Sequence, residues 1–147
     1  MLIGYTLGTT LSVRYEWLDR PWITILMVGA MLPDVDKISL LLSDQLLAQQ
    51  LGIPFSWTVI HLPVGALLLS AVGGLLVSPR YRLRMFSLLV FGAASHIFLD
   101  QLAIFTTGYS YPQLWPLTTY HFPAGGLYQS SDRWPAILSA FLATLAY

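Results

Sequence analysis

His96 and Asp100 lie four residues apart in the stretch FGAASHIFLDQL, which is otherwise almost wholly apolar. On a helix, side chains four residues apart share one face and lie one above the other. A polar group in apolar surroundings costs roughly 2 to 7 kcal/mol unless a partner satisfies it. The pair therefore has two interpretations: it belongs to a metal or catalytic site, or it forms a hydrogen bond that joins two helices.

Three further ionisable residues occur in or beside apolar segments. Asp34 and Asp36 follow a Leu-Pro pair, and His61 interrupts an apolar segment. With the first pair they supply two imidazoles and three carboxylates, a set that can hold one or two Zn²⁺, Mn²⁺ or Fe²⁺ ions. Such an ion lowers the pKa of a bound water towards 7 and stabilises an oxyanion. We therefore consider as metal ligands Asp34, Asp36, His61, His96 and Asp100, with zinc as the first choice and manganese or iron as alternatives.

Each of these residues also has a structural interpretation. Asp34 and Asp36 could cap an amphipathic helix and complement its dipole. His61 could be an interfacial histidine that is hydrogen-bonded to a loop. His121 and Trp115 lie in a long aromatic loop near the C-terminus. We interpret His121 as structural or substrate-facing rather than as a ligand, and Trp115 as a loop anchor or a substrate-facing residue.

The composition is that of a membrane protein. Hydrophobic residues make up 56% of the chain and charged residues 10%, whereas a soluble domain has nearer a quarter charged residues. The length of 147 residues suits one domain, so we expect residues 1–147 to form a single integral membrane domain. The net charge of zero gives no basic surface for nucleic acid. The absence of cysteine excludes thiolate metal sites, disulfides and cysteine nucleophiles.

The elements that must position the ionisable residues are helices. The sequence predicts an all-α, polytopic transmembrane bundle of about four to five hydrophobic helices, with one broken helix after Pro33. After the break, Asp34 begins an amphipathic helix that runs to about Leu51. Twelve residues of helix cover only about 18 Å, so the first segment is too short to span ~30 Å of hydrocarbon. The apolar segments are residues 2–13, 22–32, 57–77, 85–105 and 134–147.

The distribution of positive charge predicts the orientation. If the segments alternate across the membrane, the loops at 14–20 and 78–84 share one side. That side holds most of the basic residues: Arg14, Arg20, Arg80, Arg82 and Arg84. The positive-inside rule makes it cytoplasmic. Counted along the helices, His96 lies about 18 Å from Arg84 and Asp34 about 18 Å from Trp22, which places both in the outer half of the membrane or at its outer edge.

The order of these motifs resembles that of a known family. The chain has L-P-D-V-D at residues 32–36, a later histidine, H-x-x-x-D at 96–100 and W-P-L at 115–117. From residue 1 to about residue 126, this combination resembles membrane-bound metal-dependent hydrolases of the YdjM type. The resemblance implies metal-dependent hydrolysis in the membrane, and the family's likeness to zinc-dependent phospholipase C enzymes implies a phosphoester or lipid substrate. The positions that match the family's metal ligands are Asp34, Asp36, His61, His96 and Asp100.

Two features depart from the family pattern. The family has a histidine just before the apolar segment that here begins with Leu2, and the chain starts at Met1. The family's H-x-x-x-H-S motif is here W-T-V-I-H-L-P at 57–63. These differences leave three alternatives: one metal rather than two, a misplaced start codon, or a diverged member without catalysis.

Taken together, the sequence predicts a multi-pass protein of the inner (plasma) membrane with its metal site on the extracytoplasmic side. The expected activity is hydrolysis of a lipid or phosphoester by a metal-activated water, with Asp36 or Asp100 as catalytic base if it is not a ligand. The expected partners are the lipid bilayer and that substrate, and oligomerisation is left open. The alternatives are a small ion or solute transporter, which shares the broken helix and buried carboxylates, and a non-catalytic membrane scaffold subunit.

Overall fold

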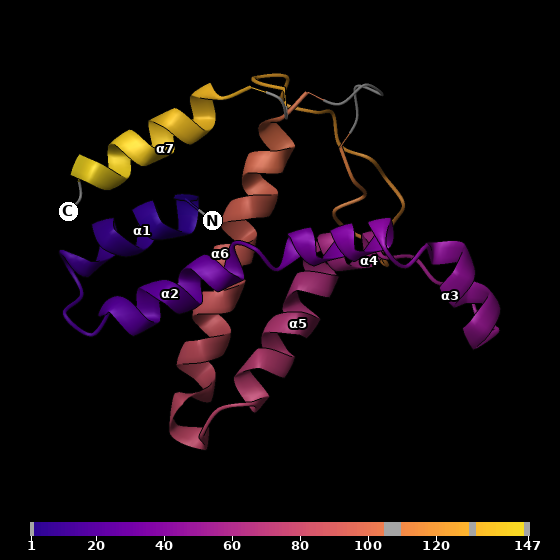
Figure 1. The fold of residues 1–147 in the computed structure, drawn as a ribbon, viewed down its shortest axis with the longest axis horizontal. Coiled ribbons are helices and arrows are strands. Elements are labelled where there is room, and N and C mark those ends of the chain that lie inside the picture. The colour runs from indigo at the N-terminus through magenta and orange to yellow at the C-terminus, as the bar shows by residue number, and fades with distance from the viewer. Residues whose placement is uncertain (1, 105–109, 130–131, 146–147) are drawn as a thin grey trace.

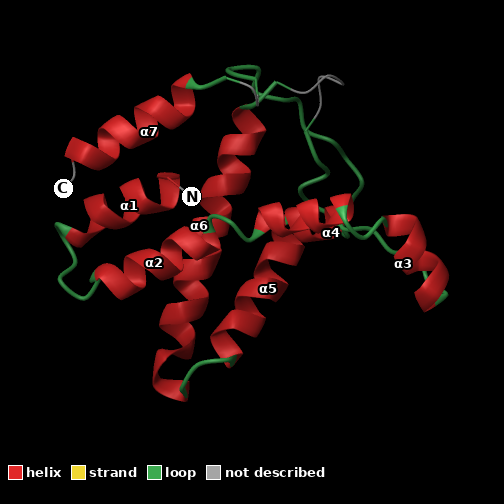
Figure 2. Ribbon diagram, in the orientation of Figure 1, coloured by secondary structure: helices red, strands yellow, loops and turns green. Residues whose placement is uncertain are grey.

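The computed structural model describes residues 2–104, 110–129 and 132–145. Among these residues the fold is all-α, as predicted (Figures 1 and 2). One isolated bridge pairs Ala103, just after the longest helix, with Tyr128 in the loop that follows. Two of the helical elements, η1 and η2, are 3₁₀ helices. The elements in chain order are α1 (Leu2–Ser12), α2 (Arg20–Gly29), η1 (Pro33–Leu40), α3 (Asp44–Leu51), α4 (Thr58–His61), α5 (Pro63–Leu75), η2 (Pro79–Tyr81), α6 (Arg82–Leu102) and α7 (Trp134–Leu145).

The longest helix, α6, is the axis of the fold. Among the described residues, the segment Pro79–Leu102 is the one helical stretch long and apolar enough to cross a membrane. Only 22% of its apolar window is buried within the protein, whereas the core helix of a soluble protein is mostly buried. The apolar helices α5 and α7 are shorter than a full span. The bundle of several spans therefore stays a prediction, while the long apolar helix at the predicted place is found.

Helices α5 and α2 pack against α6 on two sides. Helix α5 runs beside it, and α2 crosses it on another side (Figure 1). Helix α1 packs against α2 and α7, so the two terminal helices lie together (Figure 1). The small apolar core lies where α2 meets α6 and contains Ile23 and Leu26 from α2 and Leu88 from α6. This packing holds the end of α2 against the middle of α6.

The crossing of α2 and α6 is unusually close because both helices have glycine there. A Cβ atom at Gly92 would lie 2.3 Å from the carbonyl oxygen of Leu26, and one at Gly29 would lie 2.5 Å from that of Leu89. Small residues allow such backbone approaches between helices. The close crossing brings the last carbonyl groups of α2 to the face of α6 that carries His96.

The predicted break at Pro33 is confirmed, but the segment after it differs from the prediction. Helix α2 ends at Gly29, and the chain continues into η1. A single amphipathic helix from Asp34 to about Leu51 is wrong, because Ser43 is extended and its hydroxyl accepts a hydrogen bond from Leu46 N at 3.3 Å. Serine in this position caps a new helix, and α3 starts there.

The predicted span at 57–77 is also divided. Helix α4 ends at His61, Leu62 is extended with φ −83° and ψ 158°, and α5 begins at Pro63. Proline disfavours helical conformation in the residue before it and suits the first turn of a helix, so the chain bends at Leu62. The bend turns His61 inward, where its side chain is 7% exposed.

The two basic loops meet at one end of α6. The guanidinium of Arg84 lies 4.9 Å from the ring centroid of Trp17 and 5.1 Å from that of Trp22. The rings of Trp22 and Tyr81 are 5.8 Å apart. The loop before α2 and the start of α6 therefore share one side of the molecule, as the alternation of segments predicts for these two loops. His96 and Asp100 lie near the other end of α6.

Candidate metal centre

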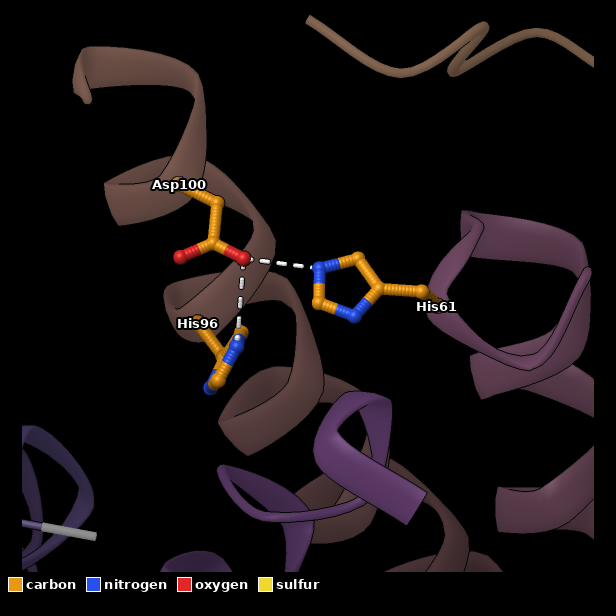
Figure 3. Close-up of side chains that lie close together, drawn as sticks. All are labelled: His61, His96 and Asp100. Atoms are coloured by element: carbon orange, nitrogen blue, oxygen red, sulfur yellow. Dashed lines mark hydrogen bonds and ion pairs between the residues drawn. The ribbon is translucent and has the colours of Figure 1, made fainter. Parts of the chain in front are cut away.

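One carboxylate oxygen forms the centre of the site. Oδ2 of Asp100 lies 2.7 Å from Nε2 of His61 and 3.3 Å from Nε2 of His96 (Figure 3). His96 and Asp100 share a face of α6 because they are four residues apart. His61 comes from the end of α4, so the site joins segments that are distant in sequence (Figure 3). Ligand atoms of all three residues lie within 4.8 Å of one another.

The ring of His96 is held in place by the end of α2. Its Nδ1 donates a hydrogen bond to the carbonyl oxygen of Ala30 at 2.8 Å. This carbonyl is available because α2 ends at Gly29 and the last carbonyls of a helix lack intrahelical donors. A carbonyl oxygen can only accept, so the proton of the neutral ring lies on Nδ1. The lone pair on Nε2 then faces Asp100.

The ring of His61 is held in the same way by the broken helix. Its Nδ1 lies 3.2 Å from the carbonyl oxygen of Pro33 and 3.3 Å from Oδ2 of Asp36. Both are acceptors, so Nδ1 carries the proton of the neutral ring, and Nε2 again faces Asp100. Metal-ligating histidines usually donate their second ring N–H to a carbonyl or carboxylate, which fixes the tautomer and the ring orientation.

This arrangement requires a positive charge at its centre. Two lone pairs on nitrogen and a carboxylate oxygen repel one another unless protons or a cation lie between them. The carboxylates of Asp34, Asp36 and Asp100 and the ammonium of Lys37 leave two negative charges. Two protonated imidazoles or one divalent cation would balance them equally. Two imidazole nitrogens and a carboxylate oxygen are ligands that Zn²⁺ accepts in proteins.

Asp34 lies on the open edge of the cluster. Its Oδ1 is 3.8 Å from Nε2 of His96 and 2.6 Å from Nζ of Lys37. The hydrogen bond from Lys37 to Asp34 raises the pKa of the Lys37 ammonium above its ordinary value, so the group stays charged. The Asp34 side chain is 36% exposed, whereas that of His96 is 15% exposed. Asp34 therefore offers a carboxylate between the cluster and solvent.

Asp36 lies behind His61, on the side away from Asp100. Its Oδ2 contacts Nδ1 of His61, while Oδ1 is buried and has no hydrogen-bond partner among the described residues. A buried carboxylate oxygen without a donor is costly. Asp36 thus orients His61 in this arrangement, and its second oxygen can take up a further cation, proton or water. The donor set of His61, His96 and Asp100 fits a bound cation.

Several contributors to the site were missed in the sequence. The carbonyl groups of Ala30 and Pro33 leave no sequence signal beyond the helix break itself. Lys37 follows Asp34 by three residues, a spacing that predicts an ion pair on a helix. Tyr111 covers His61 with its ring at 4.7 Å between centroids, and burial raises the pKa of the Tyr111 hydroxyl above its ordinary value. No spacing rule connects Tyr111 to His61.

The two loop residues that we considered as substrate-facing, His121 and Trp115, do not belong to the cluster of His61, His96 and Asp100. Nδ1 of His121 lies 2.8 Å from the carbonyl oxygen of Ser110, within the loop itself. His121 is not one of the three residues whose ligand atoms converge in the described part of the chain. Trp115 is 37% exposed and precedes the cis Pro116. A substrate-facing role for either residue stays a prediction.

The fold and the site define an α-helical protein with one long apolar helix and a cluster of two histidines and one aspartate that could hold a metal ion. The profile of the family described as YdjM inner membrane protein matches residues 1–147, so the chain belongs to this family. The resemblance is confirmed and covers the whole chain. Searches of curated proteins and of solved structures found no match. Membership of an inner membrane family makes the lipid bilayer the surroundings of the protein.

Proposed function

We propose that the protein is a membrane-embedded metal-dependent hydrolase of a phosphoester or lipid-type substrate. One observation carries the proposal. His61 and His96 are each fixed through Nδ1 to a backbone carbonyl, and both direct Nε2 at the same oxygen of Asp100. A structural hydrogen bond needs one such ring, whereas a metal site needs several ligands around one point. We assign His61, His96 and Asp100 as the metal ligands.

The donor set favours zinc, with manganese or iron as alternatives. The site has nitrogen and oxygen donors, and the chain has no cysteine. Imidazole and carboxylate suit these three ions, which differ in preferred geometry more than in ligand type. When bound, such an ion supplies a Lewis acid and lowers the pKa of a bound water towards 7. Asp100 serves as a ligand in this assignment rather than as the base.

Hydrolysis also needs a group that takes a proton from the attacking water and returns it to the leaving oxygen. The sequence offered Asp36 or Asp100 for this role. The unpartnered oxygen of Asp36 is buried behind His61, whereas Asp34 is partly exposed beside Nε2 of His96. We therefore propose Asp34 as the base and Asp36 as a positioning residue. Lys37, bound to Asp34, would balance the charge of an anionic substrate.

The same proposal includes the position of the protein in the membrane. We propose that residues 1–147 form one multi-pass domain of the inner membrane, with the cluster on the extracytoplasmic side. The support is that arginines gather at the opposite end of α6 from the cluster. Because the chain has no cysteine, single substitutions can report the orientation. Ser78→Cys should react with a membrane-impermeant maleimide only after the cells are opened, and Ser43→Cys should react in intact cells. The reverse pattern would contradict the orientation.

A second candidate function is supported by one distance. The 2.7 Å between His61 and Asp100 is that of an ordinary charge-assisted hydrogen bond. A protonated pair of this kind would suit a non-catalytic scaffold or a transporter that handles protons. Either alternative predicts a protein that binds no stoichiometric metal, and the transporter predicts flux in liposomes without ester turnover.

The proposed base is tested by Asp34→Asn. The purified protein in detergent is supplied with Zn²⁺ and assayed on a panel of phosphomonoesters, phosphodiesters and phospholipids. Loss of a general base lowers turnover by about 10²- to 10⁴-fold, so Asp34→Asn should lose turnover by about that factor yet keep its zinc. Asp19→Asn is the matched control, because Asp19 makes no side-chain cap to α2 and lies near the opposite end of α6. Equal turnover of Asp34→Asn and the wild type, or turnover that survives chelation, would contradict the assignment.

A further inference from the structure

A second groove of the molecule lies between α1 and α2, which run side by side (Figure 1). Glycines of α1 let the two helices approach closely. A Cβ atom at Gly4 would lie 2.9 Å from the Cα atom of Met27. One at Gly8 would lie 2.8 Å from Cγ2 of Ile23. The two helices are therefore antiparallel, and the end of α1 lies level with the start of α2, at the end of α6 where the two basic loops meet.

Two stripes of side chains line this groove, which has a volume of about 520 Å³. Residues three or four apart on a helix share a face, and the lining residues have this spacing. They are Tyr5, Thr9 and Ser12 from α1 and Arg20, Thr24 and Met27 from α2. Ser12 and Arg20 lie at the end next to the loop at 14–20, whereas Tyr5 and Met27 lie at the inner end. The groove is therefore most polar next to that loop and more apolar farther in.

The polar groups of the groove are open to a ligand. The side chains of Arg20 and Thr24 are exposed, and that of Ser12 is half-buried. Arg20 forms no ion pair within the part of the chain that the structure describes. A guanidinium presents planar N–H donors that match the oxygens of a phosphate. Arg20 therefore offers the groove an available phosphate-binding group.

The two hydroxyl groups at this end offer lone pairs rather than protons. The hydroxyl of Ser12 donates to the carbonyl oxygen of Thr9 at 2.8 Å. That of Thr24 donates to the carbonyl oxygen of Arg20 at 3.0 Å. A hydroxyl has one proton and two lone pairs, so both oxygens can accept from a ligand but not donate to it. A ligand that satisfies them carries its own N–H or O–H donor.

The charges beside the groove suit a zwitterion. The loop at 14–20 holds Arg14, Glu16, Asp19 and Arg20, so its net charge is zero. Neither acidic side chain forms an ion pair with another described residue. The arginines attract a phosphate, and the carboxylates repel a second negative charge but attract an ammonium. A headgroup with one phosphate and one ammonium therefore matches both signs.

We propose that the groove between α1 and α2 binds a phospholipid of the phosphatidylethanolamine type, with its phosphate at Arg20 and its ammonium at Ser12 and Thr24. The ammonium supplies the N–H donors that the two hydroxyl oxygens accept. The acyl chains follow the inner end of the groove past Met27. Basic pockets between the helices of membrane proteins bind lipid headgroups by the same forces. The site lies near the opposite end of α6 from the cluster and needs neither a metal nor the proposed reaction.

The headgroup is tested with the full chain in detergent, by native mass spectrometry during titration with lipid. Phosphatidylcholine is the matched lipid, because it has the same phosphate and the same net charge but no N–H donor. A hydrogen bond to a charged group changes affinity by about ten-fold or more, so phosphatidylethanolamine should bind about ten-fold more tightly than phosphatidylcholine. Equal affinity for the two lipids would overturn the proposal.

Two variants test the assigned partners. Arg20→Ala should weaken the binding of both lipids by about ten-fold, because it removes a charge-assisted hydrogen bond to the phosphate. Arg82→Ala is the matched control, since Arg82 is exposed at the same end of the molecule and does not line the groove. Equal effects of the two variants would show only a general attraction of lipid to arginine and overturn the proposal.

The double variant Ser12→Ala, Thr24→Val should bind phosphatidylethanolamine no better than phosphatidylcholine. Its affinity for phosphatidylcholine should equal that of the wild type, which also shows that the variant is folded. A preference for phosphatidylethanolamine that survives in the double variant would overturn the assignment of the two hydroxyls.

The lipid is distinguished from its headgroup by glycerophosphoethanolamine, which has the same phosphate and ammonium but no acyl chains. Because the inner end of the groove is more apolar, this compound at the concentration of the lipid should not displace it. Displacement would identify a site for the soluble headgroup and overturn the assignment to a lipid. The zinc content of Arg20→Ala should equal that of the wild type, so the lipid site and the hydrolase can fail separately.

Discussion

The two ends of α6 both gather charged and aromatic side chains, but they hold them in different ways. At the basic end, Arg84 lies over the rings of Trp17 and Trp22, and Arg80 lies over Tyr81. These are contacts that exposed arginine side chains make with aromatic rings. At the other end, His61, His96 and Asp100 converge on one point, and each imidazole is fixed by a backbone carbonyl of another segment.

The arginines at the basic end and the imidazoles of the cluster differ in how freely they can change their contacts. An exposed arginine keeps its hydration and can exchange one ring for another, so its loss changes little. The imidazoles of the cluster are largely buried and have no such freedom, because Nδ1 of each ring is hydrogen-bonded to a backbone carbonyl, of Ala30 for His96 and of Pro33 for His61. The basic end is therefore suited to anchoring at a membrane surface, and the cluster end to precise coordination. Substitutions at the two ends should differ in size accordingly.

The largest effect is expected for His96→Ala. The variant loses one of three proposed ligands, and because loss of an outer-shell partner alone costs 10- to 100-fold in metal affinity, loss of a ligand should cost more than about 100-fold. Zinc affinity can be measured by competition with a chromophoric chelator. His121→Ala is the matched control, since its ring binds Ser110 within the loop. If His96→Ala and His121→Ala had equal zinc affinity, His96 would not be a zinc ligand.

Gly92→Ala should have the next largest effect. The added methyl would lie 2.3 Å from the carbonyl oxygen of Leu26 and must push α2 away from α6. Overpacking of this kind costs about 1 to 3 kcal/mol of stability. It should also weaken zinc binding, because Ala30 moves with α2. Thermal unfolding and zinc titration check both effects.

Gly73→Ala provides the control for this prediction. There the new methyl would meet only the terminal Cδ1 of Leu89, at 2.6 Å, and that side chain can turn aside. We expect a smaller loss of stability and unchanged zinc affinity. If Gly92→Ala left zinc affinity unchanged despite its loss of stability, the crossing would not position the cluster.

Asp36→Asn should have a moderate effect confined to the cluster. The variant keeps the shape of the side chain but weakens its hold on Nδ1 of His61, which lies 3.3 Å from Oδ2. Zinc affinity should fall by about 10-fold, as for outer-shell partners in general. Asp19→Asn should show no change in the same chelator titration. A loss as large as that of His96→Ala would instead make Asp36 a direct ligand.

The smallest effect is expected at the basic end. Arg84→Ala removes contacts with two rings, and exposed cation–π contacts contribute about 0.5 to 1 kcal/mol each. Unfolding in detergent should show a loss of about that size, and zinc affinity should not change. If Arg84→Ala lowered the zinc affinity, the two ends of α6 would be coupled.

The sequence predicted the parts of this arrangement that follow from local rules. The spacing of His96 and Asp100 placed them on one face, Pro33 broke the helix, and the long apolar helix lies within three residues of its expected start. The counted depths of His96 and Asp34 placed these two residues at a similar level, because the rise per residue of a helix is fixed. The all-α class followed from the same periodicity.

The remaining features depend on contacts that no spacing encodes. The cap at Ser43 and the bend at Leu62 divide segments that read as continuous helices. The acceptors that orient both rings are backbone carbonyls, which every residue has, so only the three-dimensional crossing shows which carbonyls are used. Tyr111 reaches His61 across 50 positions of chain, a contact set by the path of the loop.

The central claim is that the cluster holds one divalent metal ion, and elemental analysis of the purified wild-type protein tests it most directly. The protein is prepared without chelator, dialysed, and measured for zinc, manganese and iron per chain. The account predicts close to one ion per chain, restored by reloading after the metal is stripped. A protein that is metal-free and cannot be reloaded would contradict the account, and the cluster would then be a protonated link between α4 and α6.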